Sequence, residues 1–171
     1  MLGVETERRF LIRMPAPELL ARFESSDIEQ TYIISDGGGR ARVRRRGNSG
    51  RWTYTFTEKK RISQMSRIEN EREIDEGEYL ALLERADPKR RCVRKTRYIY
   101  PYLGQNFEID VFPFWQDRAI MELELDSEGQ TIALPPDISV IKEVTLDGRY
   151  TNSSLAAEVP YDDITSQSEV L

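Results

Sequence analysis

Polar and apolar residues alternate along many short stretches of this chain, and that period of two is the pattern of half-buried β-strands. Residues that favour turns (Gly, Pro, Asn and Asp) separate these stretches at the spacing of β-hairpins. The pattern therefore predicts seven or eight antiparallel strands that form a barrel or a strongly curved sheet. The expected strands cover residues 5–12, 30–34, 40–46, 52–59, 67–74, 92–100, 107–112 and 120–125.

Helical patterns interrupt the strands at residues 17–24 and 75–87. The second begins with Asp75 and Glu78, which are spaced as in a capping box. Residues 142–145 and a helix-like segment at 153–157 close the domain. We therefore expect an α+β fold, an eight-stranded antiparallel β-barrel with a few helices packed outside. One domain is expected over residues 1–158, followed by a polar, acidic and mobile tail over residues 159–171.

Three consecutive glycines follow Asp36, and such a run can form a phosphate-binding loop. That motif also requires a lysine followed by serine or threonine and then a helix, and neither follows here. We therefore interpret residues 36–39 as a hairpin turn.

Charged residues on the expected strands are sorted by sign, so that some strand faces are basic and others acidic. Glu122 and Glu124 share one face, for example, whereas Arg42 and Arg44 share a face of another strand. Two interpretations are open: the charged rows are solvated outer faces, or they line the interior of the barrel. An interior location requires counterions, because an uncompensated buried charge costs several kcal/mol. Phosphate groups together with Mg²⁺ or Mn²⁺ would satisfy both signs at once.

Glu5, Glu7 and Arg9 fall on one face of the first expected strand. The two carboxylates would lie about 6.6 Å apart along the strand, so they repel each other unless a cation neutralises them. Carboxylate oxygens are the ligands that Mg²⁺, Mn²⁺ and Ca²⁺ prefer. The alternative is that these charged side chains form the solvent-exposed face of an edge strand. We favour a metal-binding face, because the same pattern recurs along the chain.

Composition narrows the chemistry. The chain has 171 residues, of which 39% are hydrophobic and 32% charged, which is typical of a globular protein. It contains no histidine, which excludes Ser-His-Asp and Cys-His catalysis, and a single cysteine, Cys92, which excludes an internal disulfide. The net charge of −5 argues against a nucleic-acid partner. We expect a cytoplasmic protein, because we find no signal peptide and no apolar run long enough to span a membrane.

Glu5-x-Glu7-x-Arg9 resembles the ExExK signature at the amino terminus of CYTH-domain proteins, the triphosphate tunnel metalloenzymes. That motif alone has low specificity, but further motifs follow in the family's order over about residues 2–157. They are Arg42-Val43-Arg44, Thr57-Glu58-Lys59, Arg67-x-Glu69-x-Glu71, Lys95-Thr96-Arg97-Tyr98, Glu108-x-Asp110-Val111-Phe112, Glu122-x-Glu124 and Glu143-Val144-Thr145.

The resemblance implies an antiparallel tunnel with a charged interior that binds triphosphate groups and uses Mg²⁺ or Mn²⁺. By matching positions, the metal ligands would be Glu5, Glu7, Glu69, Glu71, Asp110, Glu122 and Glu124. The phosphate-binding residues would be Arg42, Arg44, Lys59, Arg67, Lys95 and Arg97. The catalytic set would be Glu5, Glu7 and Arg9. Arg9 replaces the signature lysine; it keeps the positive charge but is bulkier and effectively never deprotonates.

The implied activity is divalent-metal-dependent hydrolysis of a small triphosphate, first of all inorganic tripolyphosphate. One alternative is an adenylyl cyclase. A second is a thiamine triphosphatase in which Trp52 or Trp115 stacks on the heterocycle. A third is a non-catalytic module that binds polyphosphate or RNA through Arg40–Arg46 beside the aromatic residues Trp52 and Tyr54. The sequence leaves the physiological substrate, the preferred metal and the oligomeric state open.

Overall fold

The computed structural model describes residues 2–35 and 40–163. Its strands are β1 (Leu2–Arg13), β2 (Glu24–Ile33), β3 (Arg40–Asn48), β4 (Arg51–Arg61), β5 (Ser66–Ile74), β6 (Val93–Tyr102), β7 (Gln105–Val111), β8 (Arg118–Glu124) and β9 (Val140–Glu143). The helical segments are α1 (Pro17–Leu20), α2 (Glu76–Leu83), the 3-10 turn η1 (Gly148–Tyr150) and α3 (Asn152–Ala157).

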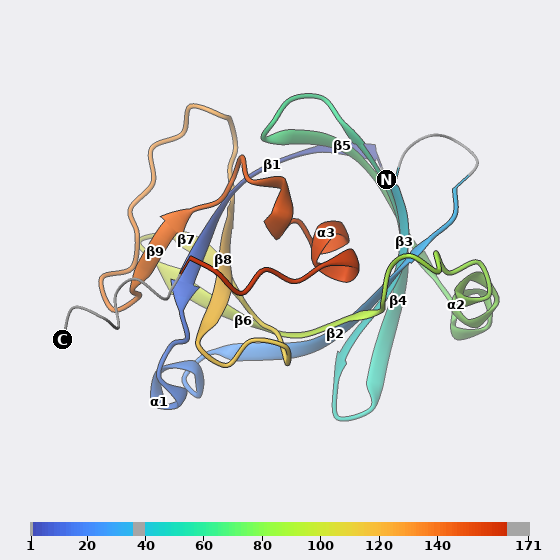
Figure 1. Cartoon of the computed structure of the whole chain (residues 1–171), viewed down its shortest axis with the longest axis horizontal. Helices are drawn as coiled ribbons and strands as arrows, with labels where there is room; N and C mark the ends of the chain where they lie inside the picture. Colours follow the sequence, from blue (N-terminus) through green and yellow to red (C-terminus); the bar gives the residue numbers. More distant parts are fainter. Residues whose placement is uncertain (1, 36–39, 164–171) are drawn as a thin grey trace.

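Eight strands form a closed antiparallel ring in the order β5-β4-β3-β2-β6-β7-β8-β1 (Figure 1). β1 closes the ring because its first half, residues 2–6, pairs with β5, whereas residues 7–13 pair with β8. The short strand β9 adds to β1 at residues 10–12. The expected eight-stranded antiparallel barrel is therefore confirmed, with β9 as an additional strand.

Two tight hairpins fix the register of the inner faces. Ser49 and Gly50 connect β3 to β4 with φ angles of 53° and 79°, and Leu103 and Gly104 connect β6 to β7 with φ angles of 47° and 75°. Two-residue turns with positive φ at both positions match the right-handed twist of paired strands. The turn expected at residues 36–39 lies outside the described residues.

β2 begins at Glu24, six positions before the strand expected from residue 30. Its polar first half pairs with β6, from Glu24 opposite Ile99 to Gln30 opposite Val93, so sheet pairing overrides the weak local pattern. The strand also shortens α1 to four residues.

At α2, the Asp75 carboxylate accepts the Glu78 N–H at 2.8 Å, which confirms the predicted cap. The helix ends at Leu83, however, not near residue 87.

Apolar side chains on the outer faces of the strands pack in two clusters. Phe10, Ile12, Ile109 and Met121 pack with Leu20 of α1. The second cluster lies against α2 and contains Ile33, Ala41, Val43, Ile74 and Tyr79. These two clusters agree with the prediction that apolar faces turn outwards against helices.

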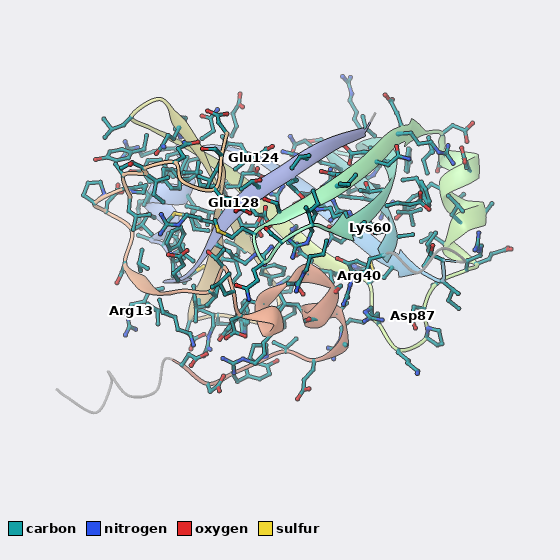
Figure 2. All side chains as sticks on the ribbon, turned by 90° about the horizontal axis from the view of Figure 1, so that it is seen from above. Arg13, Arg40, Lys60, Asp87, Glu124 and Glu128 are labelled. Atoms are coloured by element: carbon teal, nitrogen blue, oxygen red, sulfur yellow. The ribbon has the colours of Figure 1, made fainter. Side chains whose placement is uncertain are left out.

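A third apolar cluster lies on the inner faces, which the sequence analysis did not predict. Leu11, Phe112 and Ile120 alternate in phase with the charged inner residues of their strands, and they pack against Tyr150 and Leu155. η1 and α3 project within the ring in Figure 1 and lie to one side of the barrel in Figure 2. Helical residues therefore cover part of one mouth, held there by inward-facing apolar side chains.

The segment that follows α3 is bound to the barrel as far as it is described. The indole N–H of Trp115 donates to the Pro160 carbonyl at 2.8 Å, and Arg118 donates to the carbonyls of Tyr161 and Asp162. Asp163 accepts from the Tyr150 hydroxyl. Residues 159–163 therefore differ from the mobile tail that we expected, because their backbone and carboxylates are hydrogen-bonded. Within the described ranges, no helix is long and apolar enough to cross a membrane.

Candidate active site

The barrel encloses a cavity of about 620 Å³ whose lining is mostly charged. All eight strands of the ring contribute lining residues, and the segment from η1 to α3 contributes the rest. Among the lining side chains are seven carboxylates: Glu5, Glu7, Glu69, Glu71, Glu108, Glu122 and Glu124. The cationic side chains are Arg9, Arg40, Arg42, Arg44, Arg46, Lys59, Lys60, Arg61, Arg67, Lys95 and Arg97. The ionised rows thus converge on a central hollow, as the second of the two interpretations required.

The carboxylates gather where β1 lies between β5 and β8, and we call Glu5, Glu7, Glu69, Glu122 and Glu124 the carboxylate half. The strand register places Glu7 opposite Glu124. Burial and the charge of Glu122 raise the pKa of Glu7 to about 8. Burial, together with the charge of Glu5, also raises the pKa values of Glu69 and Glu124. This half therefore holds more negative charge than its own partners neutralise.

Arg9 is the cation buried within the carboxylate half. Its Nη2 donates to Glu7 at 2.7 Å and its Nε donates to Glu122 at 3.0 Å, while Arg9 itself is 6% exposed. Burial would raise the pKa of Glu122, but Arg9 and Arg97 outweigh it and lower that pKa to about 2. Lys59 binds Glu5 in the same way, at 2.8 Å. Three of the five carboxylates in this half, Glu7, Glu69 and Glu124, keep raised pKa values despite these cations.

Another part of the lining is rich in cations, and we call Arg42, Arg44, Lys95 and Arg97 the cationic half. It adjoins the carboxylate half, because Arg97 Nη2 lies 3.9 Å from Glu122. Burial and the charges of Arg42 and Arg97 lower the pKa of Arg44 to about 10. Arg42 is 8% exposed, and among the described residues its Nε has no hydrogen-bond partner. A buried guanidinium N–H without an acceptor is costly, and an anionic ligand would satisfy it.

Asp110 anchors two of these cations from behind the cavity wall. It accepts Lys95 Nζ at 2.7 Å and Arg97 Nε and Nη2 at 2.8 and 2.9 Å. Both side chains of the Asp110–Lys95 pair are 1% exposed. Burial opposes ionisation of Asp110, but Arg97 and Lys95 outweigh it and hold its pKa below the usual value. Asp110 is not among the residues that line the cavity, and Lys95 and Arg97 occupy its carboxylate; its expected role as a metal ligand stays a prediction.

All the other site residues expected from the sequence line this cavity, from every strand on which they were expected. The sequence analysis missed Tyr32 and the η1–α3 residues Asn152 and Ser153 as site residues. It named Glu108 only as part of a motif and Arg40–Arg46 only as a basic stretch, whereas Glu108, Arg40 and Arg46 all line the cavity. No sequence signal points to Asn152, because it enters the cavity from a short helix outside the ring.

The two tryptophans lie away from the cavity lining. Trp115 is 3% exposed in the apolar cluster behind η1, and Trp52 lies under the guanidinium of Arg45 on the outer face, 4.2 Å from it. The aromatic footprint considered for RNA therefore faces away from Arg42 and Arg44.

The carboxylate half has the oxygen chemistry that a hard divalent cation needs, and its raised pKa values reflect burial first and repulsion between carboxylates second. Across residues 2–35 and 40–163, no three acidic, histidine or cysteine side chains are already gathered as an ion-binding group. Arg9 and Lys59 form ion pairs with three of the carboxylates, Glu7, Glu122 and Glu5. The donor set fits a metal in type, and the side chains would have to turn towards it.

Comparison with known proteins places the chain in a family. No established family profile matches it. An inorganic triphosphatase of Nitrosomonas europaea is 33% identical over 160 residues, covering 91% of this chain and 99% of that protein. The solved structure of the inorganic triphosphatase NE1496 aligns over 92% of this chain and 97% of its own, with a TM-score of 0.58 and 30% identity.

A putative adenylate cyclase of Bacillus halodurans shares the fold alone, with 16% identity, a TM-score of 0.52 and coverage of 74% of this chain and 83% of its own. The relative of more than 30% identity extends over almost the whole chain, and the closed charged barrel agrees with it. The chain belongs to the CYTH family of triphosphate tunnel proteins.

Proposed function

We propose that this protein hydrolyses inorganic tripolyphosphate in a reaction that depends on Mg²⁺ or Mn²⁺. The observation that carries the proposal is the separation of charge inside one cavity, where Arg44 has a lowered pKa and Glu7 a raised one. A short polyanion would neutralise the first region and a divalent cation the second. The relatives named inorganic triphosphatase support the same reaction.

The cationic half would bind the phosphate chain. Arg42 offers its unpartnered Nε, and Lys95 and Arg97 are held in place by Asp110, so donors are oriented before the substrate arrives. Such preorganised donors stabilise charge that develops on phosphate oxygens during transfer. Water would attack one terminal phosphorus, the P–O–P bond would break, and orthophosphate and pyrophosphate would leave.

The carboxylate half would hold the metal through Glu5, Glu7, Glu69, Glu122 and Glu124, with Glu71 as a further candidate. A metal bound there would neutralise phosphate oxygens and lower the pKa of a bound water. Arg9 would restrain Glu7 and Glu122 in the cavity, because its guanidinium contacts both carboxylates. We assign Asp110 to anchoring the cations.

The test is phosphate release from tripolyphosphate with and without Mg²⁺ or Mn²⁺. We expect turnover that EDTA abolishes and that the double variant Glu122→Gln/Glu124→Gln loses by at least about a hundredfold. Glu58→Gln is the matched control, because Glu58 is exposed and lies outside this cavity on β4. No turnover above the double variant, or full turnover in EDTA, would contradict the proposal.

ATP and thiamine triphosphate belong in the same substrate panel. Cyclic AMP and pyrophosphate produced from ATP would identify a cyclase, whereas preferred hydrolysis of thiamine triphosphate would identify a different esterified substrate. We expect tripolyphosphate to be preferred, since the tryptophans considered for stacking lie outside the lining.

A further inference from the structure

Asn152 lines the cavity although it belongs to α3 and not to one of the strands that form the ring. It is the first residue of α3, and it lines the cavity with its neighbours Thr151 and Ser153. Its side chain meets a buried cation of the phosphate-binding region, because the Lys95 ammonium lies 3.2 Å from Asn152 Oδ1. The residue therefore stands beside the group that would hold a phosphate.

The chemistry of this contact fixes the orientation of the Asn152 amide. An ammonium group carries three donors and no acceptor, so it can be bound only by the amide oxygen. The amide NH₂ is then the remaining polar group of the side chain, and it offers two N–H donors. A neutral donor beside Lys95 adds hydrogen bonds for an anion without adding another buried charge.

Contacts on several sides hold α3 in this position. Leu155 and Ala156, 1% and 0% exposed, pack into the inner apolar cluster. Arg40 donates to the Ser153 hydroxyl, and Figure 2 shows Arg40 beside α3. Arg90 Nε donates to the Ser153 carbonyl at 3.2 Å. A side chain on a segment so held loses little further freedom on binding a ligand.

We propose that Asn152 is a substrate-binding residue whose amide N–H groups donate to the phosphate group that lies against Lys95. This inference rests on the proposed triphosphatase function and adds a ligand contact from outside the barrel strands. The alternative role for Asn152 is positioning, in which its oxygen only orients Lys95. The two roles predict different results for two substitutions.

Asn152→Ala removes both the oxygen and the NH₂ group, whereas Asn152→Asp keeps an oxygen for Lys95 and removes the donors. For a substrate contact, we expect KM for tripolyphosphate to rise about tenfold in the alanine variant and further in the aspartate variant. We expect kcat to stay within about threefold, because the contact exists before and during the reaction. Asn106→Asp is the control, since Asn106 is exposed on the β6–β7 hairpin and does not line the cavity.

The thermal midpoint of each variant establishes that it is folded, and the tripolyphosphate-induced shift of that midpoint in EDTA measures binding without turnover. Smaller shifts for both Asn152 variants, with a normal shift for Asn106→Asp, support the contact. An aspartate variant with wild-type KM and shift, or an alanine variant unchanged in both, overturns it. Failure of the wild-type protein to hydrolyse tripolyphosphate would instead contradict the proposed function.

Discussion

The two halves of the cavity carry opposite charge, and each contains one buried side chain of the opposite sign. In the cationic half that side chain is Asp110, which accepts three hydrogen bonds from Lys95 and Arg97. In the carboxylate half it is Arg9, which donates to Glu7 and Glu122. The two internal counterions differ in position, because Arg9 lines the cavity and Asp110 lies behind its wall.

This difference separates a rigid region from an adaptable one. Asp110 fixes the cations without occupying the space where an anion would bind, so the cationic half is preorganised. Arg9 occupies space among the carboxylates and leaves Glu7, Glu69 and Glu124 with raised pKa values. The carboxylate half is therefore incompletely neutralised and can exchange protein contacts for a cation. The following substitutions test that contrast.

The largest expected effect is that of Asp110→Asn. The variant leaves Lys95 and Arg97 buried without their shared anion, and breaking a buried ion pair from one side costs about 3–5 kcal/mol. Urea unfolding should report that loss in the free energy of unfolding. Asp126→Asn, at an exposed position, should change it by less than about 0.5 kcal/mol. Equal stability of the two variants would show that the cationic half does not depend on its anchor.

Arg42→Gln addresses ligand binding in the cationic half. Losing a charged donor to phosphate should raise KM for tripolyphosphate by about tenfold to a hundredfold, with a smaller effect on stability. Arg45→Gln is the neighbouring control, because Arg45 is on the other face of β3, where it binds Glu29 at 2.8 Å. Initial-rate kinetics of both variants decide the matter. If KM for Arg42→Gln is no higher than KM for Arg45→Gln, Arg42 does not contribute to substrate binding.

The inner faces were predictable because the side-chain period of a strand is fixed. Once Glu122 and Glu124 were assigned to one face, and Arg42 and Arg44 to another, only the choice between inward and outward remained. The ordered family motifs indicate that the charged faces point inwards, and the cavity lining agrees with this prediction.

The alternation of side chains along a strand predicts which residues point inwards, but not whether an inward side chain reaches the cavity or stays buried behind its wall. Asp110 has the inward phase of Glu108, yet it lies behind the wall because Lys95 and Arg97 cover it. Leu11 has the phase of Arg9, yet it packs against Leu155 and Trp115 near the mouth. Both outcomes depend on partners that are distant in sequence, as does the position of Asn152. Pairing between distant strands likewise extended β2 beyond its local pattern.

The carboxylate half should make the metal-free protein less stable as pH rises. Burial and the charge of Glu122 raise the pKa of Glu7 from its usual value of 4.5 to about 8 in the folded protein, which therefore binds more protons than the unfolded one between these pH values. The free energy of unfolding should therefore fall between pH 5 and pH 8, by on the order of 3 kcal/mol from this group. The lowered pKa of Glu122 acts only below about pH 4.5 and does not oppose this trend.

Glu7→Gln removes that titration. In EDTA, its unfolding free energy should vary less between pH 5 and pH 8 than that of the wild type, whereas Mg²⁺ should flatten the wild-type profile by stabilising the carboxylate. Urea titrations at several pH values measure both slopes. Identical slopes for the variant and the wild type would mean that Glu7 is not the group under repulsion.

The smallest expected effect comes from Arg9→Lys, and it separates holding the carboxylates from competing with a metal. A lysine ammonium lacks the rigid fork through which Nε and Nη2 bind Glu122 and Glu7, so its contacts should be weaker and stability should fall by about 1 kcal/mol. Because the contact with Glu7 is weaker in this variant, Glu7 should bind a cation more readily. The Mg²⁺ concentration that gives half-maximal activity should therefore fall. Arg8→Lys is the control: Arg8 forks onto Glu143 outside the cavity, so it should lose similar stability without moving the Mg²⁺ midpoint. A higher midpoint in Arg9→Lys would show that Arg9 assists metal binding, and the carboxylate half would then be as preorganised as the cationic one.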